Sequence, residues 1–178
     1  PSRIRAAAKK FQEQEVKSPL SWLKLACHST ATISAKEIEA KVIDLGRRGW
    51  PPDVVICDYA DILAPPPGIA EGRERINVTW QQLRGLAISQ HCLVVTATQS
   101  DADSYSARTL TRRNFSDDKR KNATVTAMFG LNQTEEERNL GTMRLNKVVL
   151  RDGEFSSERF VHVAPCLDLA NPCVRSCF

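Results

Sequence analysis

The chain has 178 residues, of which 42% are hydrophobic and 26% are charged, and its formal net charge is +4. This balance is typical of a globular domain and excludes a disordered or fibrous chain. The longest apolar runs fall well short of the roughly 20 residues that a membrane helix needs, and no apolar signal segment follows the basic N-terminus, so we expect a cytoplasmic protein. The mild positive charge permits a nucleic-acid partner without requiring one.

The first predicted elements are a helix, a short strand and a second helix. Residues 3–16 are rich in helix-forming residues and lack Gly and Pro, so they predict a helix, and residues 20–26 predict a short strand. Ser34 followed by Glu37 is a capping box, which predicts the start of the second helix. Its apolar face and the glycines expected to close it are Ile38, Val42, Ile43, Leu45, Gly46 and Gly49.

Two uniformly apolar runs follow, residues 54–57 and 92–97, which predict strands buried on both faces of a parallel sheet. A Pro/Gly-rich loop over residues 64–68 and a helix over residues 75–89 connect them. The inward side of that helix is predicted to carry Ile76, Leu83, Leu86 and Ala87. Residues 101–121 are charged and almost free of apolar side chains, so we expect a long loop, or a loop with weak structure.

The C-terminal third predicts strands over residues 124–131, 143–150 and 158–163, with a surface turn at 135–138. Asp152-Gly153 is a hairpin-turn signal between the last two strands, and few structural signals follow Pro165. The order of elements predicts an α/β fold, in which a mostly parallel sheet is flanked by helices and has a C-terminal antiparallel extension.

The six cysteines give no metal pattern. Cys57 and Cys92 fall in apolar strands, where buried free thiols are expected. The last three, Cys166, Cys173 and Cys177, have a spacing that matches no common zinc site, so we expect no metal there.

Polar residues follow both apolar strands, Asp58 after the first and Gln99 after the second. Ligands of open α/β sheets bind at the carboxyl ends of the strands, and adjacent parallel strands would bring these two residues side by side. An Asp there can hold Mg²⁺ beside nucleotide phosphates, and a Gln can sense a γ-phosphate or position a water. Taken alone, an Asp in this place is more commonly an ordinary residue that ends a strand, and Gln99 alone is plausible as an ordinary loop amide.

Several segments, in order, resemble the RecA-type P-loop ATPase core of DnaB-like replicative helicases, in particular those of phages and prophages. Residues 54–63 resemble the Walker B strand, and residues 94–100 resemble the strand that ends in a Ser-Gln or Thr-Gln element. Residues 33–41 and 82–87 are similar to the flanking helices, and residues 143–151 to a late strand with a Lys and an arginine finger. The similarity implies a partial RecA-like core over residues 1–163 and a C-terminal tail over residues 164–178.

The resemblance implies roles for individual residues. Asp58 would be the Walker B carboxylate and the metal ligand, with Tyr59 and Asp61 beside it at the nucleotide, and Gln99 would couple the nucleotide to the DNA loops. The basic pair that would reach the γ-phosphate of a neighbouring subunit is Lys147 and Arg151. The family places its Lys and Arg two residues apart rather than four, and a solvated basic hairpin face is the alternative, about equally favoured for Arg151.

The loops after the two strands would face a channel that carries single-stranded DNA, for which positive charge is needed. The basic residues implied are Arg73, Arg75, Arg108, Arg112, Arg113, Lys119, Arg120 and Lys121. Tyr105 and Phe115 could stack on bases. A solvated charged loop is the alternative, because the same segment contains several Asp residues.

The sequence contains no Gly-x4-Gly-Lys-Ser/Thr phosphate-binding loop. We therefore expect a C-terminal part of an ATP-dependent DNA motor, which in the complete protein would use ATP and Mg²⁺, form a hexameric ring and bind single-stranded DNA. This chain alone is expected to bind no cofactor and hydrolyse no ATP. The alternatives are a non-catalytic nucleic-acid-binding or scaffold module of the same fold and, less favoured, a signalling ATPase of the same superfamily.

Overall fold

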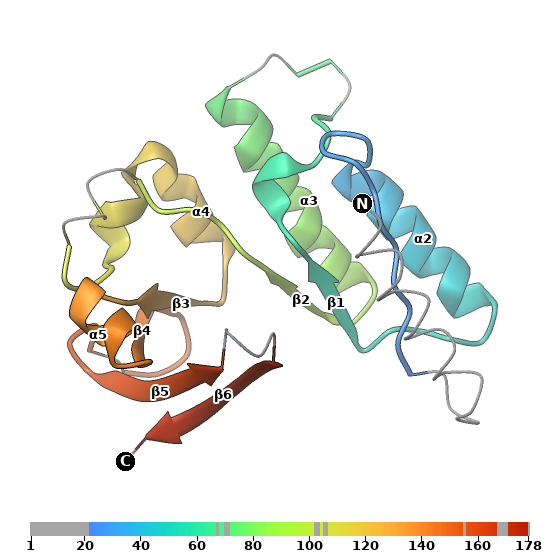
Figure 1. Cartoon of the computed structure of the whole chain (residues 1–178). Coiled ribbons are helices and arrows are strands. Elements are labelled where there is room, and N and C mark those ends of the chain that lie inside the picture. The colour runs from blue at the N-terminus through green and yellow to red at the C-terminus, as the bar shows by residue number, and fades with distance from the viewer. Residues whose placement is uncertain are drawn as a thin grey trace.

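A computed structural model describes residues 22–66, 68–69, 72–101, 104, 107–154, 156–166 and 171–177. The helix predicted over residues 3–16 lies outside them. Figure 1 shows two groups of elements, one with the parallel strands and the long helices and the other with the antiparallel sheet and short helices. Within the described part of the chain, no helix combines the length and the apolar content that crossing a bilayer requires.

Helix α2 (Ala35–Arg47) begins at the predicted capping box. The Ser34 hydroxyl accepts a hydrogen bond from the Glu37 backbone N–H at 3.3 Å, and the Glu37 carboxylate accepts one from the Ser34 N–H at 2.8 Å. Gly46 lies inside the helix, and Gly49, with φ of +85°, follows its end. Residues 22–26 form no strand, because no described strand lies beside them to complete a ladder, so that part of the strand prediction is wrong.

The strand pair has the predicted parallel topology. Strand β1 (Val54–Cys57) pairs in parallel with β2 (Leu93–Thr96), and α3 (Arg73–Ser89) connects them after the short 3-10 helix η1 (Ala60–Ile62). The inner faces of the strands pack on α2 and α3 through a core that includes five of the eight predicted helix residues, but not Ile43, Leu45 or Ala87. Members of this core are Ala35, Ile38, Val42, Cys57, Ile76, Trp80, Leu83, Leu86 and Val94.

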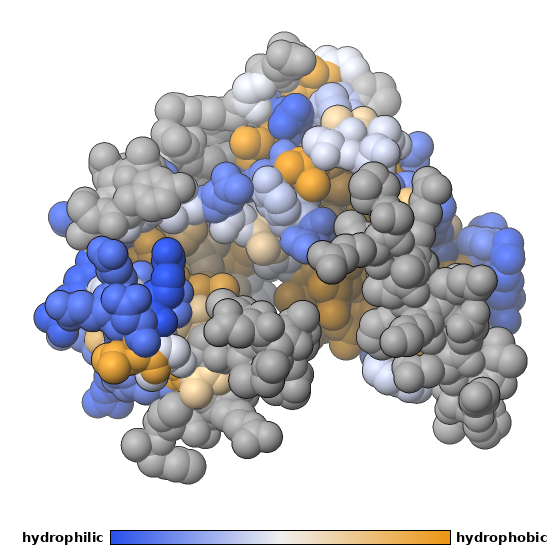
Figure 2. All heavy atoms as spheres, in the orientation of Figure 1, coloured by the Kyte–Doolittle hydropathy of each residue, from blue (hydrophilic) through white to orange (hydrophobic). Residues whose placement is uncertain are grey.

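The outer face of β1 and β2 is solvent-exposed, so the prediction of strands buried on both faces is wrong for the described residues. Ile56 is 74% exposed, and Val54, Leu93 and Val95 lie on the same side of the sheet. Figure 2 shows hydrophobic residues gathered over these two strands in the middle of the view. The strands are apolar on both sides, but in the described structure helices cover only one side.

The second group contains more regular structure than the sequence indicated. The region predicted as a loop over residues 101–121 contains the 3-10 helix η3 (Arg112–Asp118) and the start of α4 (Lys119–Thr124). The predicted turn at residues 135–138 is helix α5 (Glu135–Asn139), which Thr134 and Glu137 cap reciprocally. Both corrections concern short helices whose stability comes from caps and tertiary contacts rather than from an apolar stripe.

The antiparallel sheet has the strand order β3-β4-β5-β6. The strands are β3 (Ala127–Asn132), β4 (Met143–Leu150), β5 (Phe160–Cys166) and β6 (Asn171–Cys177). Strand β6 lies in the tail that gave few sequence signals. Residues 151–159 connect β4 to β5, so the tight turn expected at Asp152-Gly153 is wrong, since the register pairs Asn146 with Phe160.

A buried polar pair organises the inner face of this sheet. Asn132 donates from its side-chain amide to Asn146 Oδ1 at 2.9 Å, and Asn146 donates to the carbonyls of Leu110 and Ser157 at 2.9 and 3.1 Å. The sheet therefore holds both the segment before η3 and the β4–β5 connection. The apolar core beside the pair consists of Phe115, Met128, Val148 and Val149.

Candidate functional site

The carboxyl ends of β1 and β2 lie side by side, as predicted. Cys57 pairs with Thr96 in the parallel register. The Thr96 hydroxyl donates to the Cys57 carbonyl at 2.8 Å and accepts from the Ala60 N–H at 2.9 Å, which ties the end of β2 to the chain that leaves β1. Asp58, the first residue after β1, and Gln99, the third residue after β2, therefore follow strand ends at the same edge of the sheet.

The side chains of Asp58 and Gln99 are exposed. Within the described residues, neither makes a side-chain hydrogen bond or an ion pair. A carboxylate with free lone pairs at a strand end can take up a hydrated Mg²⁺, and a free amide beside it can bind a phosphate oxygen or a water. The geometry thus leaves both groups available for a ligand, while their catalytic roles stay predictions.

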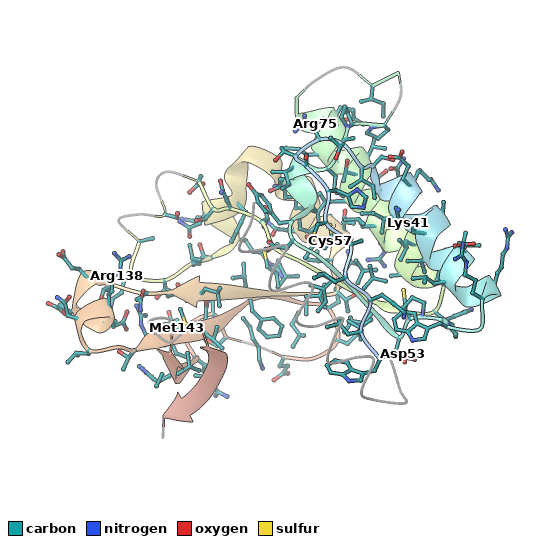
Figure 3. All side chains as sticks on the ribbon, turned by 45° about the vertical axis from the view of Figure 1, so that its right-hand side comes forward. Lys41, Asp53, Cys57, Arg75, Arg138 and Met143 are labelled. Atoms are coloured by element: carbon teal, nitrogen blue, oxygen red, sulfur yellow. The ribbon has the colours of Figure 1, made fainter. Side chains whose placement is uncertain are left out.

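Cys57, just before Asp58, is a buried thiol, as is Cys92. Figure 3 labels Cys57 near the middle of the molecule, between the strand pair and the helices. Burial raises the pKa of both thiols, and the Asp58 carboxylate adds to the rise for Cys57. Both sulfurs stay protonated near neutral pH, so the predicted buried free thiols are confirmed and act as small apolar side chains.

Asp61, predicted beside the nucleotide, is instead the centre of a polar cluster. Its carboxylate accepts from Trp80 Nε1 at 3.0 Å, from Thr98 Oγ1 at 2.6 Å and from Lys121 Nζ at 2.9 Å. The ammonium of Lys121 also donates to Thr98 Oγ1 at 2.9 Å and lies 5.5 Å from the centre of the Trp80 ring. We call these four residues the Asp61 cluster.

Two predicted site residues, Asp61 and Lys121, have different surroundings in the structure from those that the sequence suggested. Lys121, grouped with the nucleic-acid-binding residues, is 10% exposed at its side chain, and Asp61 is 17% exposed. Both are engaged with each other rather than with solvent. Thr98 and Trp80 were not predicted as members of any site, because no local pattern connects residues that are up to 60 positions apart in the sequence.

The remaining basic residues have varied surroundings. Arg75 lies at the start of α3 (Figure 3), where its guanidinium donates to the Asp61 carbonyl at 3.3 Å. Arg108, Arg112 and Arg113 have exposed side chains. The backbones of Arg73, Lys119 and Arg120 lie in α3 and α4, and their side chains fall outside the described ones.

Lys147 and Arg151, predicted to act on a neighbouring subunit, differ in their contacts. Lys147 is exposed on β4, opposite Phe129. The Arg151 guanidinium is directed at its own chain, where Nε donates to the Val125 carbonyl at 2.8 Å and a terminal nitrogen donates to the Ala123 carbonyl. Arg151 thereby caps the end of α4, since the last carbonyls of a helix lack intrahelical partners.

Two open hollows share Arg112 and Arg113 in their linings. The first has a volume of about 540 Å³ and the second of about 400 Å³. Arg151 and Asn122 contribute to the first hollow. The other lining residues are Ala123, Val149 and Leu150 in the first and Thr111, Val148 and Ser157 in the second. Three arginines that were assigned to two different sites thus share one surface.

No protein-family model matches this chain, and no curated protein sequence matches it either. Solved structures do match. A structure described as an ATPase domain superposes with a TM-score of 0.69 at 15% identity, over 78% of this chain and 50% of that one. The fold is RecA-type. A DnaB-like replicative helicase, solved to describe its interactions with primase, superposes with a TM-score of 0.65 at 14% identity, over 75% of this chain and 34% of that one.

These matches confirm the expected RecA-like α/β fold and its similarity to DnaB-like ATPase domains. At such identities the likeness is one of fold, and fold alone does not establish activity. The chain spans half or less of the length of the structures it matches. Within the described residues, no group of three or more His, Cys, Asp or Glu side chains is arranged to hold a metal.

Proposed function

We propose that this chain is the C-terminal part of an ATP-dependent DNA motor of the DnaB type. The observation that supports it most is the sheet edge, where Asp58 and Gln99 follow paired parallel strands, are exposed and make no side-chain hydrogen bond within the described residues. Asp58 would direct Mg²⁺ to the β- and γ-phosphates of ATP, with Tyr59 beside it. Gln99 would respond to the γ-phosphate.

The apolar outer face of β1 and β2 supports a further layer of polypeptide against the sheet. Burying Ile56, Leu93 and their neighbours would remove apolar surface from water, which contributes about 25 cal/mol per Å². We propose that the half of the core with the phosphate-binding loop packs there. This part of the protein would complete the nucleotide site above Asp58.

The location, assembly and ligands that we propose are those of a DnaB-type motor. The complete protein would be cytoplasmic, form a hexameric ring, bind single-stranded DNA and use ATP with Mg²⁺. Lys147 is exposed on β4 and makes no side-chain hydrogen bond or ion pair within the described residues, so it is the better candidate for a contact with a neighbouring subunit's nucleotide. The Arg151 guanidinium instead donates hydrogen bonds to the Val125 and Ala123 carbonyls of the same chain.

The test begins with the coding sequence upstream of Pro1 and uses the complete gene product. We expect Mg²⁺-dependent ATPase activity stimulated by single-stranded DNA. Asp58→Asn should lower kcat by about 100-fold or more, because a bound metal supplies several kcal/mol of transition-state stabilisation. Gln99→Ala should lower mainly the stimulation by DNA.

A matched control is Asp53→Asn, because Asp53 is an exposed carboxylate at the opposite end of β1 and should not affect turnover. Activity that survives Asp58→Asn would overturn the assignment. Mg²⁺-dependent ATP hydrolysis by the purified 178-residue chain would overturn the proposal that the nucleotide site needs a further part.

A non-catalytic nucleic-acid-binding module of the same fold is the second candidate. The three arginines around the two hollows favour it, since they could bind a polyanion without any nucleotide. A complete gene product that lacks a phosphate-binding loop and still binds single-stranded DNA would select this alternative.

A further inference from the structure

The Asp61 cluster joins the end of β2 to helix α4, towards which the chain turns as it leaves β2 (Figure 1). Thr98 is the second residue after β2, and Lys121, 23 positions further along, lies inside α4. The ammonium of Lys121 and the hydroxyl of Thr98 both donate to Asp61 Oδ2, at 2.9 and 2.6 Å. One carboxylate oxygen therefore holds both ends of the segment that begins at Gln99.

A second contact attaches the chain on the other side of Gln99. The backbone N–H of Asp101 donates to the Asn114 carbonyl at 2.9 Å. Asn114 belongs to η3, and α4 follows η3 directly in the chain. Gln99 therefore lies between two attachments to the same pair of short helices, one at Thr98 and one at Asp101. A backbone that is held on both sides leaves its side chain fewer directions to take.

The contacts of the Asp61 cluster are shielded from water. Lys121 and Asp61 have side chains that are 10% and 17% exposed. Trp80 of α3 contacts both, since its Nε1 donates to Asp61 Oδ1 at 3.0 Å and its ring centre lies 5.5 Å from the ammonium. A hydrogen bond between charged groups is stronger in such surroundings than in water. A buried ion pair adds little net stability compared with apolar side chains, but it specifies which groups meet.

The far end of α4 is held by two arginines from other elements. Arg84 of α3 donates to the Thr124 carbonyl at 2.5 Å, and Arg151, which follows β4, donates to the Ala123 carbonyl. A helix of six residues is too short to be stable on its own, so these contacts fix where α4 lies. The Asp61 cluster is the corresponding contact on the side of the sheet edge. A shift of α4 would therefore be passed to the chain at Gln99.

We propose that Asp61, Thr98 and Lys121 are positioning residues, which hold Gln99 at the sheet edge that also carries Asp58 and link its movement to η3 and α4. They act through the backbone of Gln99 and need no contact with the nucleotide. A displacement of about 1 Å at a reacting group can lower a rate by about 100-fold, so even a small shift of Gln99 is measurable. The inference rests on the proposed function only for the reaction that Gln99 serves.

Two substitutions at Thr98 separate positioning from packing. Thr98→Val keeps the shape of the side chain and removes the hydroxyl, whereas Thr98→Ser keeps the hydroxyl and removes a methyl group. In the complete gene product with Mg²⁺ and single-stranded DNA, Thr98→Val should lower kcat for ATP by about 10- to 100-fold. Its KM for ATP should stay within about twofold, because the cluster does not bind ATP. Thr98→Ser should keep most of the activity.

The matched control is Thr142→Val. The Thr142 hydroxyl also donates to a carbonyl, that of Glu137 at 3.4 Å, but Thr142 precedes β4 at the end opposite to Arg151. We expect this variant to keep its kcat. Lys121→Met breaks the same cluster as Thr98→Val, so the double variant should lose little more kcat than Lys121→Met alone. Thr98→Val keeps the test valid if Lys121→Met fails to fold.

A second readout needs neither nucleotide nor turnover. Amide hydrogen exchange of the 178-residue chain reports on the bond from the Asp101 N–H to the Asn114 carbonyl. In Thr98→Val this amide should exchange about fivefold faster than in the unaltered chain, because the loss of a hydrogen bond makes local opening easier. Thr98→Ser should leave the rate unchanged. The amides between β3 and β4 should exchange at the same rate in all three proteins.

Several results would overturn the positioning role. One is a Thr98→Val variant with the kcat and the Asp101 exchange rate of the unaltered protein. Another is the reverse order, in which Thr98→Ser is impaired and Thr98→Val is active, since that would make the role one of packing. A third is faster exchange between β3 and β4 in Thr98→Val, which would indicate general destabilisation. If ATPase activity depends on Asp58 but not on the Thr98 hydroxyl, only the positioning role fails. If the complete product has no ATPase activity, the motor proposal fails and the exchange rates still decide whether the cluster holds the chain at Gln99.

Discussion

Replacing Lys121 with Met should destabilise the fold far more than the same change at an exposed lysine. Lys121 Nζ lies 2.9 Å from Asp61 Oδ2, and the two side chains are 10% and 17% exposed. Removing one partner of a buried ion pair costs about 3–5 kcal/mol, and the residual exposure places this pair at the low end, about 3 kcal/mol. For a chain of this size, 1 kcal/mol corresponds to about 2–4 °C, so Tm should fall by about 6–12 °C.

The assay is urea unfolding followed by tryptophan fluorescence for Lys121→Met, Asp61→Asn and the double variant. Each single change leaves the other charge without its partner, so the double variant should cost about 1–3 kcal/mol less than the sum of the singles. Lys36→Met is the control, because Lys36 pairs with Glu39 at 2.7 Å with 62% of its side chain exposed. We expect that control to lose less than about 1 kcal/mol.

Additivity of the two single changes within about 0.5 kcal/mol would refute the reasoning. A loss for Lys121→Met no larger than that for Lys36→Met would refute it as well. Either result would mean that the ammonium of Lys121 is solvated and free to serve the nucleic-acid role that the sequence suggested.

Two further predictions concern the antiparallel sheet. A methyl group at Gly130 would press on Asn146 Oδ1 and lie 3.0 Å from Leu110 Cβ, so Gly130→Ala should cost about 1–3 kcal/mol. Gly85→Ala in α3, where nothing lies within 4 Å, should instead gain about 0.5–1 kcal/mol, and a reversed order of thermal midpoints would contradict the packing argument. The hydrogen bond from Arg144 lowers the pKa of Glu137 from 4.5 to about 2. The stabilisation from ionised Glu137 is therefore complete above pH 4.5 and is lost as the pH falls towards 2. In the Glu137→Gln variant, the urea concentration at the unfolding midpoint should change less with pH across that range. Equal pH slopes in the two proteins would contradict this assignment.

The parts of the fold that the sequence predicted correctly are those with local signals. Ser34 and Glu37 are three residues apart, and each caps the other, so the start of α2 could be placed from the sequence. The apolar run before Asp58 predicted β1, and its partner β2 was recognisable in the same way. Both signals depend on neighbours in the sequence, which the chain determines before any tertiary contact forms.

The predictions that were wrong depend on distant contacts. Helix α4 has no apolar stripe, and its end is held by the Arg151 guanidinium, 28 residues from Ala123. Strand β6 carries Pro172 and gave no strand pattern, yet it pairs with β5 over residues 162–166. The exposed face of β1 and β2 could not be foreseen either, because an apolar strand does not specify which layers cover it.

The Asp61 cluster explains why some polar side chains at the sheet edge are bonded within the protein while their neighbours in the sequence remain exposed to solvent. Asp61 lies three residues after Asp58 and already accepts hydrogen bonds from three side chains, so few of its lone pairs are left for a cation. Thr98 is bound to Asp61, whereas Gln99, the next residue, is exposed. The contacts of Asp61 and Thr98 hold the chain three residues after Asp58 and next to Gln99, while the side chains of Asp58 and Gln99 remain exposed. Of these two carboxylates, Asp58 is therefore the one that stays exposed, and it is the one that we propose as the metal ligand.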